Sequence, residues 1–309
     1  MKTIPLDGAL DGLRVADISD LGNYKRAVAD GRQIGFGYYF PYILTYNRPG
    51  RSAALVVEDE GSICMFRWRM RDAGPRIDVL IAPAPMSPTV LRRCLERAND
   101  FNGDKSAKVL KIDAKDIDLC ASLPDLRVTA RKTQYLYSPQ AFGKLAGSKY
   151  RTLRRNVAKV QDLDALEVHP YLPGYREACL ELLQKWRGHH QSRHGTRGGV
   201  GGTRRIIDMA DTLEKPDMFG EVIEVAGRLV AFAFGGEIRP GCAAFVEAKC
   251  DLEIPGLSYY QRYCFMSKLE SYHLLNDGPD VGREGLAQLK KSLRPVGMHT
   301  EYRAMQEGE

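Results

Sequence analysis

The sequence predicts an α/β protein with mixed sheets, built from two similar lobes in tandem. Each half of the chain contains two strand-like runs joined by a tight turn, a further strand and an amphipathic helix. The 309 residues, of which 44% are hydrophobic and 27% charged, suffice for two domains and exclude a disordered or disulfide-stapled chain. We therefore expect an N-terminal lobe over residues 1–137 and a C-terminal lobe over residues 138–309. One larger α+β domain is the alternative.

The first half begins its regular structure with a β-hairpin. Residues 52–57 and 62–70 are rich in β-branched and aromatic side chains, and the Glu58–Gly61 segment between them is a turn signal. Apolar residues at helical spacing after Pro88 predict a helix over 89–101. The other expected elements are strands at 76–81, 109–112 and 126–137, and an aromatic strand or packed loop at 38–44.

The second half repeats this pattern around two basic segments. Its expected elements, in chain order, are helices at 139–161 and 174–186, a mobile glycine-rich loop at 195–202, a hairpin of 221–226 and 229–238, a strand at 243–249 and a long helix at 258–275. Arg151, Arg155 and Lys159 are spaced four apart, so they form one row on the first of these helices.

Composition narrows the class of protein. No apolar run approaches the length of a membrane helix, and the N-terminus lacks a signal-peptide pattern, so we expect a cytoplasmic protein. The 7 cysteines are widely spaced with no Cys-x-x-Cys pair, which favours buried free thiols over disulfides or zinc. His190 and His194 are four apart, but no carboxylate or cysteine nearby completes a metal site, and Gly188 and Gly195 disfavour a helix there.

The net charge of +6 is unevenly distributed. Residues 144–159 and 187–205 carry many basic side chains and no acidic ones, which indicates a polyanionic partner; solvated basic faces are the alternative. The Arg32–Gly37 segment matches R-x-x-G-x-G, a pyrophosphate-binding pattern, yet it precedes an aromatic run instead of a helix, which disfavours coenzyme A there. Phosphate-binding loops of nucleotide enzymes and a nucleophile elbow are both missing.

Residues 275–295 form the most informative stretch. A turn rich in Asn, Asp and Gly enters a short helix, with Asp280 as the expected N-cap and Glu284 in the first turn. Glycines at this place permit close approach of a ligand or of another backbone. Spacing alone leaves open whether this is a site or an ordinary capped helix.

The stretch resembles the signature of the phosphatidylglycerol lysyltransferase C-terminal domain-like family (DUF2156), in its soluble relatives. The matching residues are Asn276, Asp280, Gly282, Glu284, Gly285, Leu286, Lys290, Ser292 and Pro295, whereas Ala287 stands where an arginine is usual. Three further segments are similar to blocks of that family, in the same order: 38–42, 135–156 and 247–260.

The resemblance implies two packed acetyltransferase-like (GNAT-like) lobes and transfer of an aminoacyl group from aminoacyl-tRNA, with no cofactor. We expect a soluble amine or hydroxyl acceptor, because the chain lacks the membrane segment of the lipid-modifying members. Two alternatives stay open. One is an acyltransferase of the GNAT superfamily that uses coenzyme A thioesters. The other is a non-catalytic polyanion- or RNA-binding module, which is favoured if Glu247, Asp280 and Lys290 prove scattered.

Within that resemblance, the candidates for catalysis are Glu247, Asp280, Lys290 and Tyr260, and Asp251 is an additional runner-up. Glu247 is expected to accept the proton of the acceptor or to bind an ammonium group, with Asp280 and Asp251 as runners-up. Lys290 is expected to stabilise an oxyanion or a terminal phosphate, supported by Tyr260. A Glu247–Lys249 ion pair is not expected, on the argument that strand neighbours point to opposite faces. The expected residues for binding substrate and tRNA are Arg131, Lys149, Arg151, Arg154, Arg155, Asn156, Asn276, Gly282 and Gly285.

Overall fold

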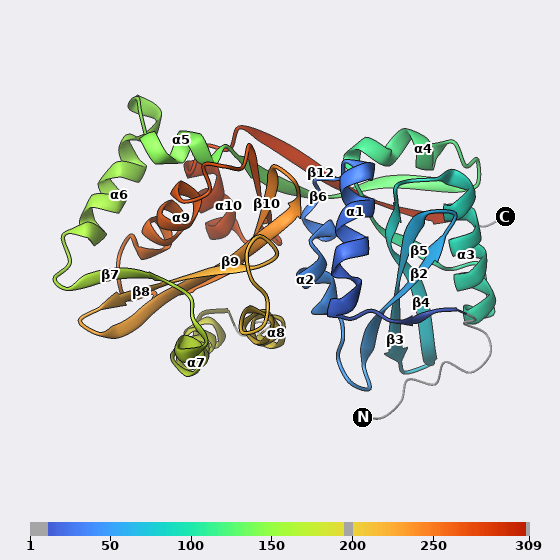
Figure 1. The fold of residues 1–309 in the computed structure, drawn as a ribbon, viewed down its shortest axis with the longest axis horizontal. Coiled ribbons are helices and arrows are strands. Elements are labelled where there is room, and N and C mark those ends of the chain that lie inside the picture. The colour runs from blue at the N-terminus through green and yellow to red at the C-terminus, as the bar shows by residue number, and fades with distance from the viewer. Residues whose placement is uncertain (1–11, 195–199, 307–309) are drawn as a thin grey trace. The chain divides into compact units, whose positions relative to one another are not determined.

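The computed structural model describes residues 12–194 and 200–306, which divide into two compact units. Unit 1 comprises residues 12–134 together with 299–306, and unit 2 comprises residues 135–298. Figure 1 shows the elements of each unit, coloured along the chain. The sequence-based division at residue 137 placed the last strand in the second lobe, whereas in the structure residues 299–306 belong to unit 1.

Unit 1 is a mixed sheet with helices packed on it. The strand order is β1-β2-β3-β4-β5-β12-β6. The strands are β1 (Arg14–Val15), β2 (Ser52–Asp59), β3 (Ser62–Arg71), β4 (Gly74–Ala84), β5 (Lys108–Ile112), β6 (Leu126–Tyr137) and β12 (Gly297–Gln306). The helices are α1 (Leu21–Gly31), α2 (Phe40–Leu44), α3 (Pro88–Asn102) and α4 (Ile117–Ala121), with 3-10 turns at Ile18–Asp20, Phe36–Tyr38 and Ala114–Asp116.

Local sequence explains the best-defined elements of unit 1. The β2–β3 hairpin turns through Glu60 and Gly61, at φ 47° and 76°, as the turn signal predicts. Helix α3 begins at Pro88 behind the N-cap Ser87 and ends at Gly103 in the left-handed conformation. Its apolar stripe packs on the sheet in a core that includes Leu55, Trp68, Val79, Leu91 and Val109.

The aromatic segment of unit 1 is helical and not a strand. It forms a 3-10 turn at Phe36–Tyr38 and then α2, in whose first turn Pro41 lies. Proline favours this position because its missing N–H would have no helical partner there. The packed-loop alternative is closer to the structure, since Tyr38, Tyr39 and Phe40 are buried.

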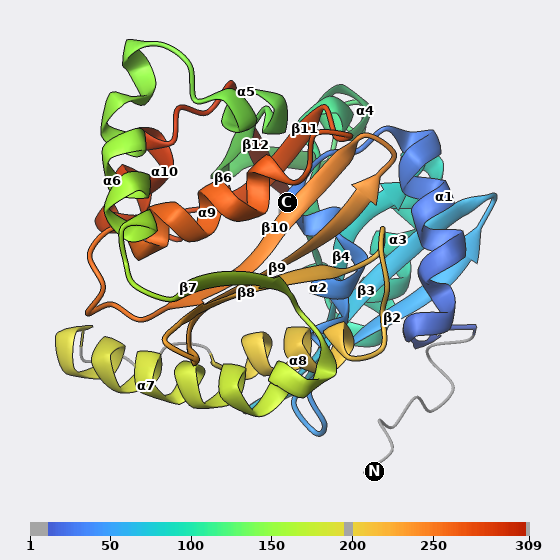
Figure 2. The same cartoon turned by 60° about the vertical axis from the view of Figure 1, so that its left-hand side comes forward.

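The strands of unit 2 also run in mixed directions and follow the order β6-β11-β10-β9-β8-β7. The strands that follow β6 are β7 (Leu166–Pro170), β8 (Phe219–Val225), β9 (Arg228–Arg239), β10 (Cys242–Cys250) and β11 (Leu274–Pro279). The helices are α5 (Pro139–Lys144), α6 (Arg151–Gln161), α7 (Arg176–His194), α8 (Val200–Ala210), α9 (Leu257–Ser267) and α10 (Glu284–Ser292), with 3-10 turns at Ser148–Tyr150 and Pro173–Tyr175. Figure 2 shows α6 and α9 on one face of this sheet and α7 and α8 on the other.

Three sequence-based elements of unit 2 need correction. The expected helix over 139–161 is broken, because Leu145 and Gly147 have positive φ angles of 39° and 88°. The expected helix over 258–275 ends at Ser267, and residues 274–275 begin β11. Helix α7 continues through Gly188, and α8 begins at Val200 within the expected loop. The rest of that loop, 195–199, lies outside the described residues.

The predicted α/β class with mixed sheets is confirmed. Both units combine parallel and antiparallel strand pairs, such as β4–β5 and β3–β4 in unit 1. All seven cysteines are free and buried, as expected. Among the described residues, no helix has the length and apolar character needed to cross a membrane.

Candidate functional site

The candidate site of unit 2 lies where two parallel strands separate. Strands β10 and β11 pair from Cys242 with Leu274 to Ala244 with Asn276. A bulge between Phe245 and Glu247 follows on β10, and β11 ends at Pro279. A bulge turns a strand and re-aims its side chains. Glu247 and Asp280 therefore both follow the point at which the two strands stop pairing.

The side chain of Lys290 binds the backbone at the end of β11. The residue is 2% exposed, and its ammonium group donates to the carbonyl oxygens of Asp277, Gly278 and Pro279, the latter two at 3.1 and 3.2 Å. Oδ1 of Asp277 lies 3.3 Å from Nζ of Lys290, and Nε of Arg262 lies 3.4 Å from Oδ2 of the same carboxylate. Burial lowers the pKa of Lys290. Lys290 therefore orders the turn that presents Asp280.

Asp280 stands at the half-buried end of this turn. Its carboxylate accepts hydrogen bonds from the Tyr135 hydroxyl at 2.7 Å and from the Gly282 N–H at 2.9 Å. These bonds lower the pKa of Asp280, whereas burial and the bond to Asp280 raise the pKa of Tyr135 to about 12. Asp280 is thus an anion at neutral pH, suited to binding a cationic group.

Asp280 is not the N-cap of α10, contrary to the expectation. Helix α10 begins at Glu284 behind Arg283, and Val281 and Gly282 intervene with φ angles of 51° and 74°. Gly282 and Gly285 face open space, since a Cβ at either position would meet no atom within 4 Å. Asn276 is buried, and its side-chain oxygen accepts a hydrogen bond from the Gly278 N–H at 2.8 Å.

Glu247 forms the ion pair that strand geometry was expected to prevent. Its carboxylate accepts a hydrogen bond from the Thr203 hydroxyl of α8 at 2.9 Å and pairs with Lys249. The expectation was wrong because residues two apart on a strand share a face. Nζ of Lys249 also lies 4.6 Å from the ring centroid of Trp186 on α7. Within the described chain, no hydrogen bond or ion pair joins Glu247 to Asp280 or Lys290.

Tyr260 belongs to a different cluster, between α9 and β8. Its hydroxyl interacts with the Cys264 thiol, and burial raises the pKa of Tyr260. Glu221 of β8 faces the same helix, is 4% exposed and pairs with Lys268. Burial also raises the pKa of Glu221. Within the described residues Tyr260 forms no hydrogen bond with Asp280 or Lys290, so it supports the packing of α9 more directly than the turn after β11.

The basic residues around α6 divide into structural and exposed ones. Arg154 donates to the carbonyl oxygens of Leu145 at 2.5 Å and Gly147 at 2.8 Å, which closes the break after α5. The side chains of Lys149, Arg151 and Arg155 are exposed. Asn156 is half-buried, and its carbonyl oxygen is 3.0 Å from where a Cβ of Gly256 would stand. Arg131 is exposed on β6 in unit 1.

The R-x-x-G-x-G segment of unit 1 is occupied by the protein itself. The N–H groups of Ile34 and Gly35 donate to Oδ2 of Asp113 at 2.9 and 2.7 Å, and the Phe36 N–H donates to Gln134 at 2.9 Å. An internal carboxylate therefore takes the place of a phosphate. These bonds occupy the backbone N–H groups of three successive residues in the segment.

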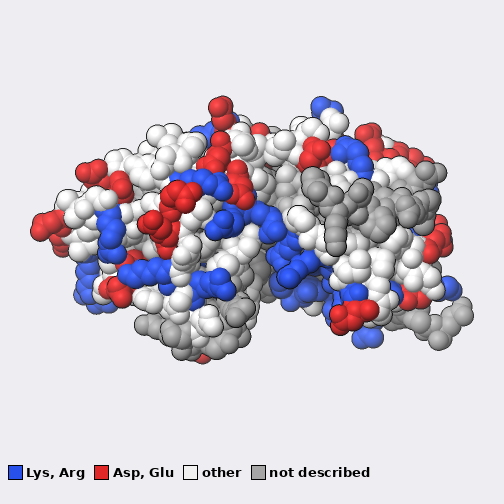
Figure 3. Space-filling model, turned by 90° about the horizontal axis from the view of Figure 1, so that it is seen from below, with Lys and Arg blue, Asp and Glu red and all other residues white. Residues whose placement is uncertain are grey.

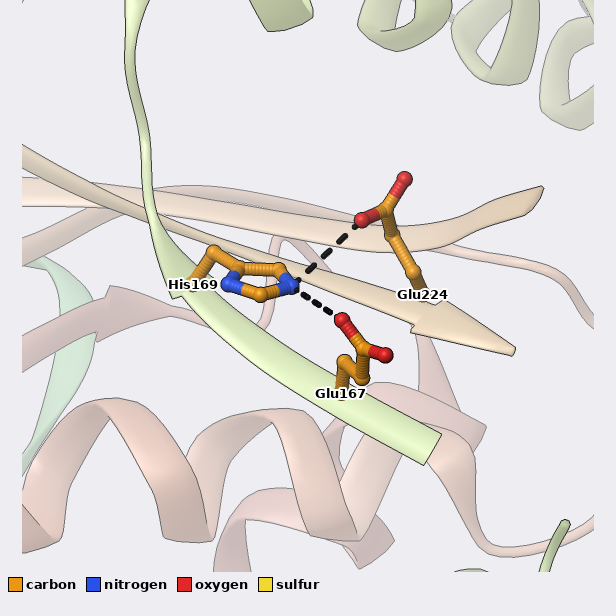
Figure 4. Close-up of side chains that lie close together, drawn as sticks. All are labelled: Glu167, His169 and Glu224. Atoms are coloured by element: carbon orange, nitrogen blue, oxygen red, sulfur yellow. Dashed lines mark hydrogen bonds and ion pairs between the residues drawn. The ribbon is translucent and has the colours of Figure 1, made fainter. Parts of the chain in front are cut away.

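Glu167, His169 and Glu224 form a cluster of possible metal ligands on β7 and β8 (Figure 4). Glu167 pairs with Glu224 across the strands. Nε2 of His169 lies 2.9 Å from Glu167 and 3.5 Å from Glu224. The His169 ring thus lies between the two carboxylates and also stacks on the Tyr175 ring, with the centroids 6.3 Å apart. The side chains of His190 and His194 lie outside the described residues.

Surface charge in unit 2 is mixed where α7 lies. Lys185 pairs with Asp251 at 2.9 Å and Glu253 at 2.8 Å, and Arg176 pairs with Asp208 and Asp211. Figure 3 shows red and blue side chains intermingled on the left of the view. Asp251 is thus a buried partner of Lys185 and Arg228, and less suited to accept a proton.

Sequence reasoning missed the ion pair between Arg262 and Asp277. Arg262 and Asp277 carry no motif of their own, because their pairing depends on how α9 packs over β11. Tyr135 was visible only within the similar block at 135–156. Its contact with Asp280 spans 145 positions, and spacing cannot reveal such a contact.

Residues 56–253 match the family described as "Phosphatidylglycerol lysyltransferase, C-terminal". The fold is similar to a conserved protein of unknown function from Bacteroides thetaiotaomicron VPI-5482, with 21% identity, a TM-score of 0.75 and coverage of 96% of this chain and 99% of that one. It is also similar to L-PGS from Bacillus licheniformis, with 16% identity, a TM-score of 0.69 and coverage of 96% and 94%.

The C-terminal domain (DUF2156) of a putative lysylphosphatidylglycerol synthetase from Agrobacterium fabrum is a third similar structure, with 18% identity, a TM-score of 0.67 and coverage of 94% of this chain and 93% of that chain. No protein of curated function matches the chain significantly. The family match covers more than half of the chain. The chain therefore belongs to the phosphatidylglycerol lysyltransferase C-terminal domain family.

Proposed function

We propose that the protein transfers an aminoacyl group from aminoacyl-tRNA to the amine or hydroxyl of a soluble small molecule or peptide, with no cofactor. The observation that carries the proposal is the family match over residues 56–253, whose description names a lysyltransferase. Family membership also supports transferase activity in general. Aminoacyl-tRNA as the donor and a soluble molecule as the acceptor are what we propose beyond it.

The chemistry asks for positioning and proton transfer more than for a nucleophile. An aminoacyl ester is already activated, so the acceptor amine or hydroxyl attacks its carbonyl carbon, and the tRNA hydroxyl leaves. The acceptor loses a proton and the leaving oxygen gains one. A nearby carboxylate can serve the first step and bind the ammonium of the aminoacyl group.

Two carboxylates support this scheme in different roles. Asp280 stays ionised because Tyr135 and the Gly282 N–H stabilise its charge, which suits recognition of the aminoacyl ammonium group. Glu247 is the proposed proton acceptor, and its side chain is 21% exposed beside Thr203 and Lys249. Lys290 is a positioning residue in this scheme, since its ammonium group is taken up by the β11 turn.

The exposed cations of α6 and the preceding turn are the proposed tRNA contact. Lys149, Arg151 and Arg155 are exposed, and an acceptor end of tRNA carries phosphates that such cations neutralise. Arg154 is excluded from this set because it holds the backbone between α5 and α6.

The test is to incubate the full chain with total tRNA charged with radiolabelled amino acids. Three acceptor arms are compared: a pool of soluble metabolites and peptides, vesicles containing phosphatidylglycerol, and no acceptor. Amino-acid-selective transfer of label into the soluble pool is expected. Transfer only into vesicles would overturn the soluble acceptor, and acyl transfer only from an added coenzyme A thioester would overturn the tRNA donor.

A further inference from the structure

Unit 1 contains a half-buried group of cations that the proposed transfer does not use. Arg67 and Arg69 lie two apart on β3 and therefore share one face of the sheet. Cζ of Arg67 lies 4.6 Å from the ring centroid of Tyr46, just after α2. Nζ of Lys111, on β5, lies 5.1 Å from that centroid and 4.4 Å from the centroid of Tyr42. Both cations thus approach one tyrosine ring.

The two arginines have buried donors without a partner. The Nε atoms of Arg67 and Arg69 are buried and have no hydrogen-bond partner among the described residues. Lys111 is 8% exposed, and its ammonium group interacts with the Tyr46 hydroxyl. Buried donors without an acceptor are costly, and buried polar groups are nearly always satisfied by protein, solvent or ligand.

The local charges do not balance. Arg69 pairs with the buried Asp78, and Glu301 is the acidic neighbour of Lys111. Arg69 and Arg48 repel the Arg67 guanidinium, whereas Tyr46 and Asp78 attract it. Within the described residues, Arg67 has no ion-pair partner of its own. Four cations against two carboxylates leave a formal excess of two positive charges in a half-buried place, which favours an anionic ligand.

We propose that Arg67, Arg69 and Lys111, with the neighbouring Arg48, bind the terminal phosphate of a small phosphate ester. A phosphate monoester carries about two negative charges near pH 7 and three acceptor oxygens, which match the excess charge and can accept from the two unpartnered arginine N–H groups. Arginine suits such an anion because its planar fork donates two parallel hydrogen bonds. The backbone phosphate of a nucleic acid carries one charge and runs along a surface, so it fits a buried amine less well.

The test measures binding of inorganic phosphate to the full chain by isothermal titration calorimetry at pH 7, with ionic strength held constant by chloride. We expect saturable binding with a Kd below about 1 mM, and no binding of acetate. Arg67→Gln should weaken phosphate binding by at least about tenfold, which is ~1.4 kcal/mol. Arg71→Gln removes an exposed arginine from the same strand and should leave the affinity within about twofold.

The stability of the variant separates binding from structure. Because burial and the like charges of Arg69 and Arg48 lower the pKa of Arg67, Arg67→Gln should unfold at the same or a higher temperature than the wild type without phosphate. If that variant does not fold, Arg67→Lys keeps the charge, loses the planar fork and should give a smaller loss of affinity.

The proposal would be overturned if the wild type showed no saturable phosphate binding, or if Arg67→Gln and Arg71→Gln lost phosphate affinity equally. It would also be overturned if the protein bound no phosphate but Arg67→Gln lowered its affinity for tRNA. The last result would assign the cluster to RNA. The measurement needs neither the aminoacyl donor nor its acceptor. Its result is therefore independent of whether the proposed transfer reaction is correct.

Discussion

Nζ of Lys290 lies 3.3 Å from Oδ1 of Asp277, and both side chains are only 3% exposed. The same ammonium group donates to three successive carbonyl oxygens at the end of β11. A side chain of α10 therefore satisfies the hydrogen-bond acceptors at the end of this strand. Arg262 takes the other oxygen of Asp277. This arrangement fixes the backbone from which Asp280 projects.

Lys290→Met should destabilise the fold strongly. Removing one partner of a buried ion pair typically costs about 3–5 kcal/mol, because a charge and its hydrogen-bond acceptors lose their compensation. Lys291→Met removes an exposed neighbour and should change the unfolding free energy by less than about 0.5 kcal/mol. Urea unfolding of the two variants checks this, and equal effects would mean that the carbonyl contacts contribute little.

Tyr135→Phe should weaken the anion at Asp280 without disturbing the sheet. The folded-state pKa of Asp280 is lowered by the Tyr135 hydroxyl and the Gly282 N–H, so its contribution to stability is present above the unfolded pKa of about 3.9 and is lost as pH falls through the lower folded value. The stability difference between wild type and variant should therefore shrink as the pH falls below about 4. Unfolding curves of both proteins that stay equally far apart down to acidic pH would contradict this role.

Arg151→Ala combined with Arg155→Ala should weaken tRNA binding and flatten its salt dependence. Two lost phosphate contacts lower the slope of log Kd against log salt by roughly 1.5. Arg92→Ala with Arg127→Ala removes two exposed arginines of unit 1 and serves as the charge-matched control. If the salt slope of the α6 double variant equals that of the wild type, the tRNA contact lies elsewhere.

Tyr46 should ionise unusually early. Although burial opposes ionisation, Lys111 and the Tyr42 hydroxyl lower the pKa of Tyr46 to about 8, and Arg67 acts in the same direction. Ultraviolet difference absorbance should show a phenol titrating near pH 8 in the wild type and not in Tyr46→Phe. A folded pKa below the unfolded value of about 10 means that Tyr46 stabilises the fold most above pH 10 and loses this effect as pH falls through 8.

The phosphate site should follow the same titration. A phenolate at Tyr46 adds a negative charge beside Arg67 and Lys111, so phosphate affinity should fall as the pH rises past about 8. Tyr46→Phe should abolish that step. If phosphate affinity depends on pH in the same way in both proteins, the ionisation of Tyr46 does not affect the cation cluster.

Sequence alone predicted most local elements and few of the contacts that shape the site. Turn residues such as Glu60 and Gly61 act over a few positions, so the β2–β3 hairpin was visible. The break in the 139–161 helix depends on Leu145 adopting a positive φ, which its residue type disfavours. Helix α7 passes through Gly188 because tertiary packing outweighs a cost of about 1 kcal/mol for glycine.

The resemblance to the family identified the candidate residues, but it did not predict which residues they contact. Asp280 and Lys290 stood in the 275–295 stretch, but the structure shows Lys290 turned inward to carbonyl oxygens instead of outward to substrate. Glu247 was picked from its strand, while its bonds to Thr203 and Lys249 depend on how α8 and the bulge in β10 place it. Contacts between distant elements arise from packing, which spacing does not encode.

The central claim is tested most directly by single-turnover transfer from radiolabelled aminoacyl-tRNA in the presence of a soluble acceptor. Wild-type protein should transfer the label, and Glu247→Gln and Asp280→Asn should each lower the rate by at least about tenfold while remaining folded. Glu253→Gln, an exposed carboxylate beside Asp251, should transfer like the wild type. Wild-type rates in both Glu247→Gln and Asp280→Asn, or no transfer by the wild type from any charged tRNA, would contradict the account.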